Sequence, residues 1–269
     1  LMTDRPETAI WLSPEEKLLA LARVKSERVA TTAVLDKLDT QKVLRGILNP
    51  VTIATGLIFL FDSITVQGVS IFAPMIVKAI YPQGSVTSLQ IRTVPFYFVG
   101  AFTVILCSSF SWKYDRRNIF FMICSPFTTV GYIMFLSSTN PSVRYAALFL
   151  ISAGAYPHGS LCSAQVAANV VSDTARSAAI GAYITIGTFG GVISTWSFLP
   201  SNGPNYSIGN GINLATSASM TLVAVALNIW MKKNNSMRDH RVDNAELAGL
   251  THEQIEDLDW HHPEFRWKP

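Results

Sequence analysis

The chain has 269 residues, of which 49% are hydrophobic and only 14% are charged, whereas soluble domains carry about 25% charged residues. Just ten Asp, Glu, Lys or Arg side chains lie between residues 50 and 231, and the other 29 lie in the two flanks. We therefore expect residues 50–231 to form a membrane domain and residues 1–49 and 232–269 to lie in water. The basic residues form no stripe interleaved with aromatic ones, which argues against a nucleic-acid partner.

The N-terminal flank contains the start of an amphipathic helix. Ser13-Pro14-Glu15-Glu16 has the pattern of a capping box with proline at the first helical position. Apolar residues then recur at helical spacing, which is typical of a helix that lies on a surface. We expect this helix to lie on the cytoplasmic face of the membrane.

Six apolar segments follow, and each is long enough to cross a hydrocarbon core of about 30 Å as a helix. They cover residues 51–79, 94–112, 118–138, 145–169, 178–199 and 212–231. Helices are expected because a backbone amide in lipid must find its partner within its own segment. In the fifth segment, the small residues Gly187, Gly190 and Gly191 are expected to let two helices approach closely.

Lys and Arg are distributed unevenly over the connections between these segments. Six crossings place 18 of them on one side and 3, namely Lys78, Arg92 and Arg144, on the other. Since loops rich in Lys and Arg stay in the cytoplasm, we expect both termini there. The tail is expected to contain a short helix that begins near Thr251. We expect an integral protein of the plasma membrane, with the lipid bilayer as its first partner.

Two ionisable residues, Asp62 and His158, lie inside the apolar segments at nearly the same depth. Charged groups at such depth are costly and mark functional sites. Polar residues share helical faces with them: Cys162, Gln165 and Asn169 with His158, and Thr55 and Thr65 with Asp62. Such stripes line a water-filled path or hydrogen-bond a neighbouring helix, and both interpretations stay open at this point.

Asp62 and His158 are further expected to face each other across a cavity and to share a proton as a coupled pair. The alternative is that His158 bonds a backbone carbonyl and Asp62 caps a helix break. The sequence contains no phosphate-binding loop, no metal-ligand spacing and no nucleophile–base–acid pattern. We therefore expect neither a metal nor another cofactor, and no enzymatic activity.

Short motifs occur in a fixed order along the whole chain. They are Trp11-Leu12-Ser13-Pro14-Glu15-Glu16, Phe72-Ala73-Pro74, Thr93-Val94-Pro95-Phe96-Tyr97, Arg144-Tyr145-Ala146-Ala147, Gly154-Ala155-Tyr156-Pro157, Pro204-Asn205-Tyr206 and Asp259-Trp260-His261-His262-Pro263-Glu264-Phe265-Arg266-Trp267. In this order, the chain resembles the C-terminal half of a major facilitator superfamily transporter. More narrowly, it resembles the fungal anion:cation symporters of the allantoate and nicotinate permease-like group.

The resemblance implies an all-α membrane protein with six transmembrane helices in two inverted three-helix repeats. The first helix of each repeat then lies on the central cavity. The implied substrate and proton pathway consists of Asp62, His158, Gln165, Asn169, Tyr156 and Thr65. Arg92 and Arg144 fall at the outer mouth, where they attract an anion or anchor the protein at the interface.

The resemblance also implies a cytoplasmic gating loop after the second helix, formed by Lys113, Asp115, Arg116 and Arg117. Trp112 stands where the family usually has an aspartate, and Asp115 is the candidate to replace it. In the fourth segment, Ser160, Gln165 and Ala168 stand where the family often has proline, tryptophan and asparagine. Substrate preference therefore does not carry over from any single relative.

The implied function is secondary active transport of a small organic anion, such as a vitamin or a nitrogen-source carboxylate, with protons and by alternating access. The substrate of such a carrier binds between two six-helix halves, so an N-terminal half is an expected partner. Two alternatives remain from the sequence. One is a non-transporting membrane sensor or an inert truncated product, and the other is a six-span membrane enzyme.

Overall fold

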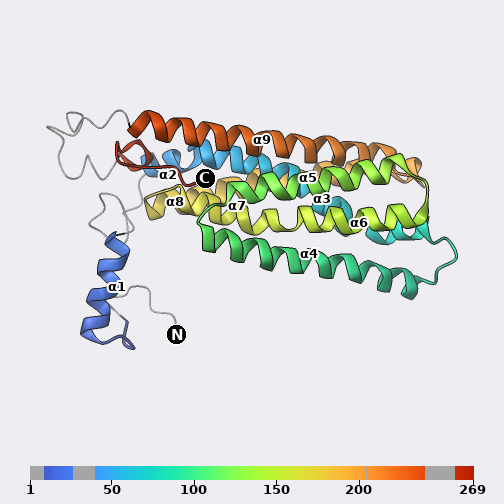
Figure 1. The fold of residues 1–269 in the computed structure, drawn as a ribbon, viewed down its shortest axis with the longest axis horizontal. Coiled ribbons are helices and arrows are strands. Elements are labelled where there is room, and N and C mark those ends of the chain that lie inside the picture. The colour runs from blue at the N-terminus through green and yellow to red at the C-terminus, as the bar shows by residue number, and fades with distance from the viewer. Residues whose placement is uncertain (1–8, 27–39, 204, 240–257) are drawn as a thin grey trace.

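The structure is a computed structural model that describes residues 9–203, 205–239 and 258–269, except for residues 27–39 (Figure 1). The described residues form helices and connecting segments, and no strand occurs among them. The expected all-α fold is confirmed. The helices are α1 (Pro14–Ser26), α2 (Thr40–Ile47), α3 (Pro50–Ile80), α4 (Val86–Tyr114), α5 (Asn118–Ser137), α6 (Pro141–Ala155), α7 (Pro157–Ala168), α8 (Asp173–Ser197) and α9 (Ser207–Asp239).

Five of these helices are long and apolar enough to cross a membrane, namely α3, α4, α5, α8 and α9. The fourth expected segment is divided into α6 and α7, which meet at Tyr156 and Pro157. Proline has no amide hydrogen and its ring crowds the preceding turn, which favours a break at Pro157, although Pro74, Pro95 and Pro126 lie inside continuous helices. The sequence pattern predicted one helix here because apolar composition records what lies in lipid and says little about a local break.

Several helices extend beyond their apolar segments. α4 begins at Val86 rather than at residue 94, and α9 continues to Asp239 rather than ending at 231. Helical hydrogen bonds do not depend on lipid, so a helix continues into water until a cap or a turn ends it. The starts carry such caps: the Asn49 side chain accepts hydrogen bonds from the first amides of α3, and Ser172 does the same for α8.

The capping box predicted at the N-terminal flank is present. The Ser13 amide donates to the Glu16 carboxylate at 2.9 Å, and the Glu16 amide donates to the Ser13 hydroxyl at 3.3 Å. α1 starts directly after it, with Pro14 as its first residue. The tail helix expected to begin near Thr251 lies outside the described residues.

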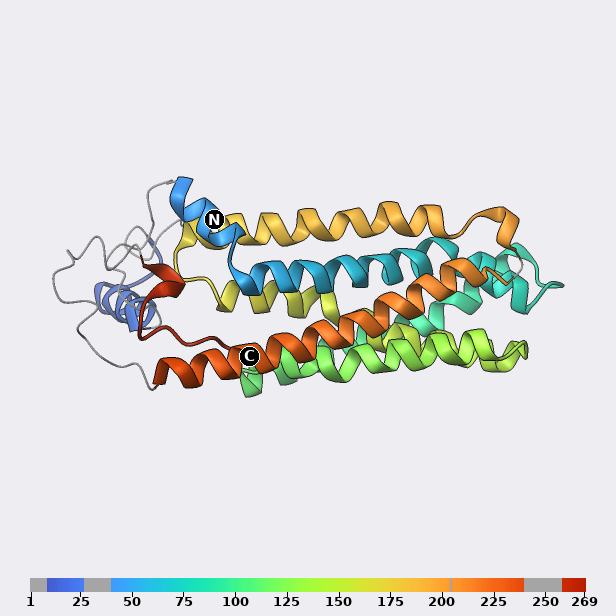
Figure 2. The same ribbon diagram turned by 90° about the horizontal axis from the view of Figure 1, so that it is seen from above.

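The helices from α3 to α9 run along one long axis and form a single bundle (Figures 1 and 2). α3 packs mainly against α8 and α9, α5 against α6 and α9, and α4 against α6 and α7. α2 lies across the start of α8. Gly187 and Gly190 make the close contact of α8 with α3, because a Cβ atom at either position would collide with Phe59 or with the backbone of Leu60. Gly191 instead faces Gln67 at ordinary contact distance.

One end of the bundle carries many basic residues, and we call it the basic end. There Asn49, between α2 and α3, donates to the Asn169 carbonyl between α7 and α8. The last residues of the chain bond both Arg117, before α5, and Asn235 of α9. The last residues of the chain, 258–269, fold back onto this end (Figure 2). We call residues 258–269 the C-terminal strap. At the opposite end, Arg144 joins the connection before α6 to the connection before α9.

Candidate functional site

Asp62 of α3 and His158 of α7 lie against each other inside the bundle. The Nδ1 atom of His158 is 3.6 Å from Oδ1 of Asp62, and their side chains are 0% and 4% exposed. The structure thus brings together the two ionisable residues that the sequence placed at one depth. Their contact is direct, and it lies within this bundle.

The helix break beside His158 sets the position of its ring. His158 follows Pro157 at the first turn of α7, and its Nδ1 atom lies 3.0 Å from the carbonyl oxygen of Ala155, the last residue of α6. The ring stacks nearly parallel on Phe121 of α5 with centroids 5.7 Å apart. Part of the alternative interpretation therefore also holds, since His158 contacts a backbone carbonyl as well as the Asp62 carboxylate.

The pair retains unused hydrogen-bonding capacity. Oδ1 of Asp62 and Nε2 of His158 are both buried and have no hydrogen-bond partner among the described residues. Buried polar atoms are nearly always partnered in folded proteins, so such atoms point to water, an ion or a proton. Four further titratable side chains lie within electrostatic range of Asp62, on α5, α7 and the break between α6 and α7: Cys124, Tyr132, Cys162 and Tyr156.

Gln165 and Asn169 lie on the same face of α7 as His158 but contact a different part of the chain. Both are fully buried, and both bind the backbone of Lys268 in the C-terminal strap. The α7 stripe therefore has two parts. His158 meets a carboxylate in the middle of the bundle, whereas Gln165 and Asn169 hold a distant segment of the chain at the basic end.

Thr65 and Tyr156 take different positions around the pair. Thr65 is fully buried and donates to the Phe61 carbonyl of its own helix at 3.4 Å. The Tyr156 hydroxyl lies 3.2 Å from the Ser70 hydroxyl, and its ring packs against Gly100 of α4. Tyr156 occupies the break between α6 and α7, one turn from the pair.

Apart from Tyr156, sequence reasoning missed a row of hydroxyl groups at the surface of the bundle, which we call the hydroxyl face. Single serines and tyrosines give no periodic signal, and only contacts between α3, α4, α7 and α8 reveal the row. The Ser108 and Ser160 hydroxyls lie 2.9 Å apart, and Tyr97 donates to the Ser70 carbonyl. The members of the face are Ser70, Tyr97, Ser108, Tyr156, Ser160 and Ser163.

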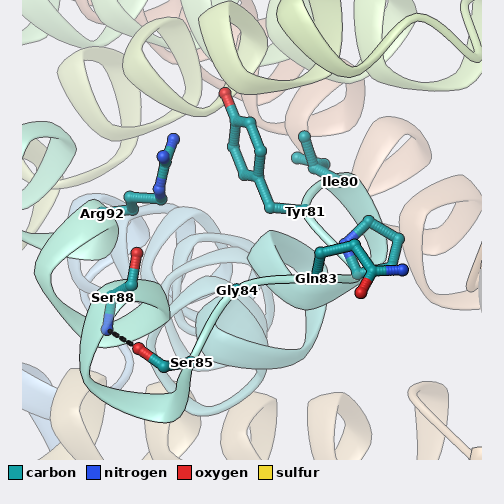
Figure 3. Close-up of a pocket in the computed structure, with 8 residues that line it drawn as sticks. Ile80, Tyr81, Gln83, Gly84, Ser85, Ser88 and Arg92 are labelled. Carbon is teal, nitrogen blue, oxygen red and sulfur yellow. Dashed lines mark hydrogen bonds between the residues drawn. The ribbon is translucent and has the colours of Figure 1, made fainter.

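The two arginines expected at the outer mouth differ in their surroundings. Arg144 donates to the Ser138 carbonyl at 2.7 Å and to the Asn205 side chain at 2.8 Å, so it fastens connecting segments to each other. Arg92 instead borders an open cavity of about 560 Å³ between the end of α3 and the start of α4. Figure 3 shows its guanidinium beside the Tyr81 ring, and 4.1 Å separates the two groups.

The expected gating loop forms the connection between α4 and α5. Asp115 has φ of 50° and ends α4, and its carboxylate binds Arg117 at 2.8 Å. The Arg117 amide donates to the carbonyl of Pro269, and Lys268 lies 3.9 Å from Asp115. Lys113 and Arg116 are exposed. The loop and the strap therefore form one structure at the basic end, a relation that no local motif reveals.

No family model and no solved structure matches the chain. An uncharacterized transporter of Schizosaccharomyces pombe is 26% identical over 237 residues, which cover 88% of this chain and 48% of that protein. A high-affinity nicotinic acid transporter of Saccharomyces cerevisiae is 24% identical over 247 residues, which cover 90% and 46%. A major facilitator-type transporter of Emericella nidulans is 26% identical over 168 residues, which cover 61% and 34%.

The chain spans about half the length of the curated relatives it matches. These relatives are named as transporters, in agreement with the expectation that the chain is not an enzyme. Together with the five long apolar helices, they support an integral membrane protein that is similar to transporters. The substrate, the coupling to protons and the roles of single residues go beyond these similarities.

Proposed function

We propose that this chain, which is similar to transporters of the major facilitator type, forms one six-helix half of a secondary carrier for a small organic anion and a proton. The substrate class is suggested by the nicotinic acid transporter among its relatives. The single observation that supports proton coupling is the buried contact between Asp62 and His158. Alternating access, in which two halves rock about a central site, is the mechanism that suits a protein of this class.

The pair couples an anion to a proton through net charge. With one proton, Asp62 and His158 are either both neutral or both charged, and the pair is neutral overall in each case. A second proton gives the pair one positive charge, which is costly inside a membrane protein unless an anion lies nearby. Proton and anion therefore favour each other's binding. The two groups titrate as a unit, with Cys124, Tyr132, Tyr156 and Cys162 as their titratable surroundings.

The hydroxyl face supports a polar cavity next to this pair. Ser70, Ser160 and Ser163 are exposed at the bundle surface. Polar groups in membrane helices face the protein interior or water because lipid offers them no partner. We propose that a second six-helix half covers this face and that the anion binds between the two, near Tyr156. The small hydroxyl donors suit a carboxylate, whose oxygens accept hydrogen bonds.

The basic end is proposed to lie in the cytoplasm, with residues 1–49 as the loop between the halves and residues 232–269 as the tail. The proposal follows from the distribution of Lys and Arg, and the plasma membrane is the proposed location. Single cysteines at Ser201 and Lys233, both exposed, test it. We expect a membrane-impermeant maleimide to label Ser201→Cys from outside intact cells and Lys233→Cys only after permeabilisation. The reverse pattern would contradict the topology.

Uptake by reconstituted vesicles tests the transport function. The protein is a twelve-helix form that carries this chain, and the probe is radiolabelled nicotinate under an imposed proton gradient. We expect gradient-driven accumulation, and we expect Asp62→Asn to abolish it while exchange of external for internal nicotinate persists. Asp173→Asn, a carboxylate near the basic end that pairs with Arg176, is the matched control and should accumulate like the unmodified protein.

Two outcomes would contradict the proposal. Accumulation by Asp62→Asn at the unmodified rate would remove Asp62 from proton coupling. A failure of nicotinate and of a panel of other small carboxylates to enter would remove the anion. A purified six-helix chain alone should not accumulate substrate, because one half provides one wall of the site.

A further inference from the structure

The backbone of Lys268 fills the hydrogen-bonding positions of two side chains on α7. The Lys268 amide donates to Oδ1 of Asn169 at 2.8 Å, and the Lys268 carbonyl accepts from Nδ2 of Asn169 at 3.1 Å. The same carbonyl also accepts from Nε2 of Gln165 at 3.2 Å. An asparagine that pairs with both the amide and the carbonyl of one residue fixes its position and its orientation.

Other residues of the strap also pack against the bundle and hydrogen-bond to it. Trp267 is 2% exposed and packs with Phe265 on the ends of α3 and α9. Arg238 of α9 donates to three carbonyls of the strap, and Asn235 binds the backbone of Trp267 in both directions. The carbonyl of Pro269 accepts from the Arg117 amide. These contacts join α7, α9 and the connection between α4 and α5, three parts that are far apart in sequence.

The strap closes the stripe that leads to the proton site. His158, Cys162, Gln165 and Asn169 follow one another on one face of α7. The strap covers the two residues nearest the basic end, and Cys162, which is fully buried, lies between them and His158. The Lys268 backbone thereby binds Nε2 of Gln165 and both polar atoms of the Asn169 amide, the two stripe side chains that lie between Cys162 and the basic end.

We infer that the C-terminal strap is an intramolecular lock on the basic end of the bundle. In the locked state the peptide group of Lys268 takes the place that a polar ligand would occupy on Gln165 and Asn169. In the unlocked state the strap leaves α7, and the stripe opens toward Cys162 and His158. The inference rests on the proposed function for its purpose, since opening this end is the step that releases a substrate. The contact itself does not depend on transport.

The reactivity of Cys162 measures the lock without any substrate. The full chain is prepared in detergent with Cys107 and Cys124 replaced by alanine, so that N-ethylmaleimide reacts with Cys162 alone. We expect Asn169→Ala to speed the reaction roughly tenfold, because it removes two hydrogen bonds to the strap and leaves the Lys268 amide unpartnered, while the Lys268 carbonyl keeps its bond from Gln165. A chain that ends at residue 257 should react faster still.

Two controls separate a lock from general loosening. Asn210→Ala removes a comparable bond at the opposite end, where Asn210 donates to the Asn205 carbonyl at 3.1 Å, and it should leave the Cys162 rate unchanged. A second single-cysteine chain retains Cys124, which is buried on α5. Its rate should not respond to Asn169→Ala or to removal of the strap.

The outcomes decide the proposal in both directions. An unchanged Cys162 rate in Asn169→Ala and in the shortened chain would overturn the lock. Equal acceleration at Cys162 and Cys124 would also overturn it, since the strap would then only stabilise the bundle. If the rates follow the lock but the twelve-helix form transports no anion, the proposed function fails and the lock stands.

Discussion

Asn169 and the Asp62–His158 pair, at two places along the α7 stripe, differ in how well their polar groups are satisfied, and Gln165 between them keeps a buried Oε1 without a partner among the described residues. At the basic end, Asn169 uses both its oxygen and its nitrogen on the strap and on its own helix. In the middle of the bundle, Asp62 and His158 touch at 3.6 Å, yet each retains a buried atom without a partner. A satisfied contact stabilises one state, whereas an unsatisfied pair responds to an added proton or ligand. The stripe thus combines a structural lock with a chemical site.

The largest expected effect breaks the lock at its most buried side chain. Trp267→Ala removes a side chain that is 2% exposed and contacts Trp230, Trp260 and Phe265. A buried tryptophan truncated to alanine costs about 3–5 kcal/mol. Amide hydrogen exchange in residues 265–269 should accelerate by roughly a hundredfold or more. Exchange around Asp62 should remain as it was, and acceleration there would contradict the separation of lock and site.

A smaller loss is expected where α2 supports the strap. A Cβ on Gly46 would collide with the backbone of Ala175 in α8, and the neighbouring Arg45 carbonyl accepts from the indole of Trp260. Gly46→Ala should destabilise the protein by about 1–3 kcal/mol in thermal unfolding, because a backbone atom cannot move aside. Gly211→Ala is the control: its Cβ meets open space, and helix propensity predicts a gain of up to about 1 kcal/mol.

Replacing Asp62 and His158 is expected to leave the stability of the protein unchanged or to raise it. A buried ion pair often costs more in desolvation than it returns, and apolar replacements are commonly neutral or stabilising. Asp62→Asn combined with His158→Phe should therefore unfold at an equal or higher temperature, with a change of about 1 kcal/mol, because His158 already stacks on Phe121. Transport should be lost in the same variant. A large drop in unfolding temperature would make the pair structural instead.

The smallest effect is a pH dependence of the lock. Burial lowers the pKa of His261 and His262 below the usual 6.5, and burial raises the pKa of Asp259 above the usual 3.8. The charges of Arg45 and Arg238 further lower the pKa of His261. The histidines favour docking when neutral, so their contribution is lost as the pH falls below about 6.5. Asp259 favours docking when protonated, so its contribution is lost as the pH rises above about 3.8 through its raised pKa.

Two variants separate these opposing contributions. The measured quantity is the rate at which N-ethylmaleimide reacts with Cys162, corrected for the change in thiol ionisation with pH. In Asp259→Asn, the pH dependence of docking comes from His261 and His262. Its strap should therefore dock less firmly at pH 5 than at pH 7.5. The double variant His261→Gln, His262→Gln leaves only Asp259, and its strap should dock no less firmly at pH 5 than at pH 7.5. Neutral His262 also accepts a hydrogen bond from the Glu264 amide, which a protonated ring cannot do. Identical pH profiles in both variants would contradict this assignment.

Much of the membrane domain could be predicted from composition and spacing. The scarcity of charge between residues 50 and 231 revealed the apolar segments, and the capping box at Ser13 located the start of α1. The common depth of Asp62 and His158, with their places on the first helix of each repeat, led to the expectation that they face each other across a cavity, and the structure places them 3.6 Å apart. The division at Tyr156 was missed, although Pro157 is its cause, because proline in the other membrane helices, such as Pro126 in α5, leaves the helix intact.

The contacts of Gln165 and Asn169, the two stripe residues nearest the basic end, could not be predicted from the sequence. Gln165 and Asn169 were expected in a pathway because their spacing matches one helical face, and spacing does not show what covers that face. Their partner is Lys268, about a hundred residues away, and the contact is made by its backbone, which has no residue-specific signal. The hydroxyl face was missed for the same reason, since Ser108 and Ser160 meet only through packing of α4 on α7.

The protonation of Asp62 during transport tests the account most directly. Infrared difference spectra of a twelve-helix form, recorded with and without the carboxylate probe, report the stretching band of a protonated carboxyl group. We predict that the anion changes this band, that Asp62→Asn removes the change, and that His158→Gln shifts it. Asp259→Asn, a buried carboxylate outside the membrane segments, should leave the change intact. A substrate-dependent carboxyl band that persists in Asp62→Asn would contradict a proton site at the Asp62–His158 pair.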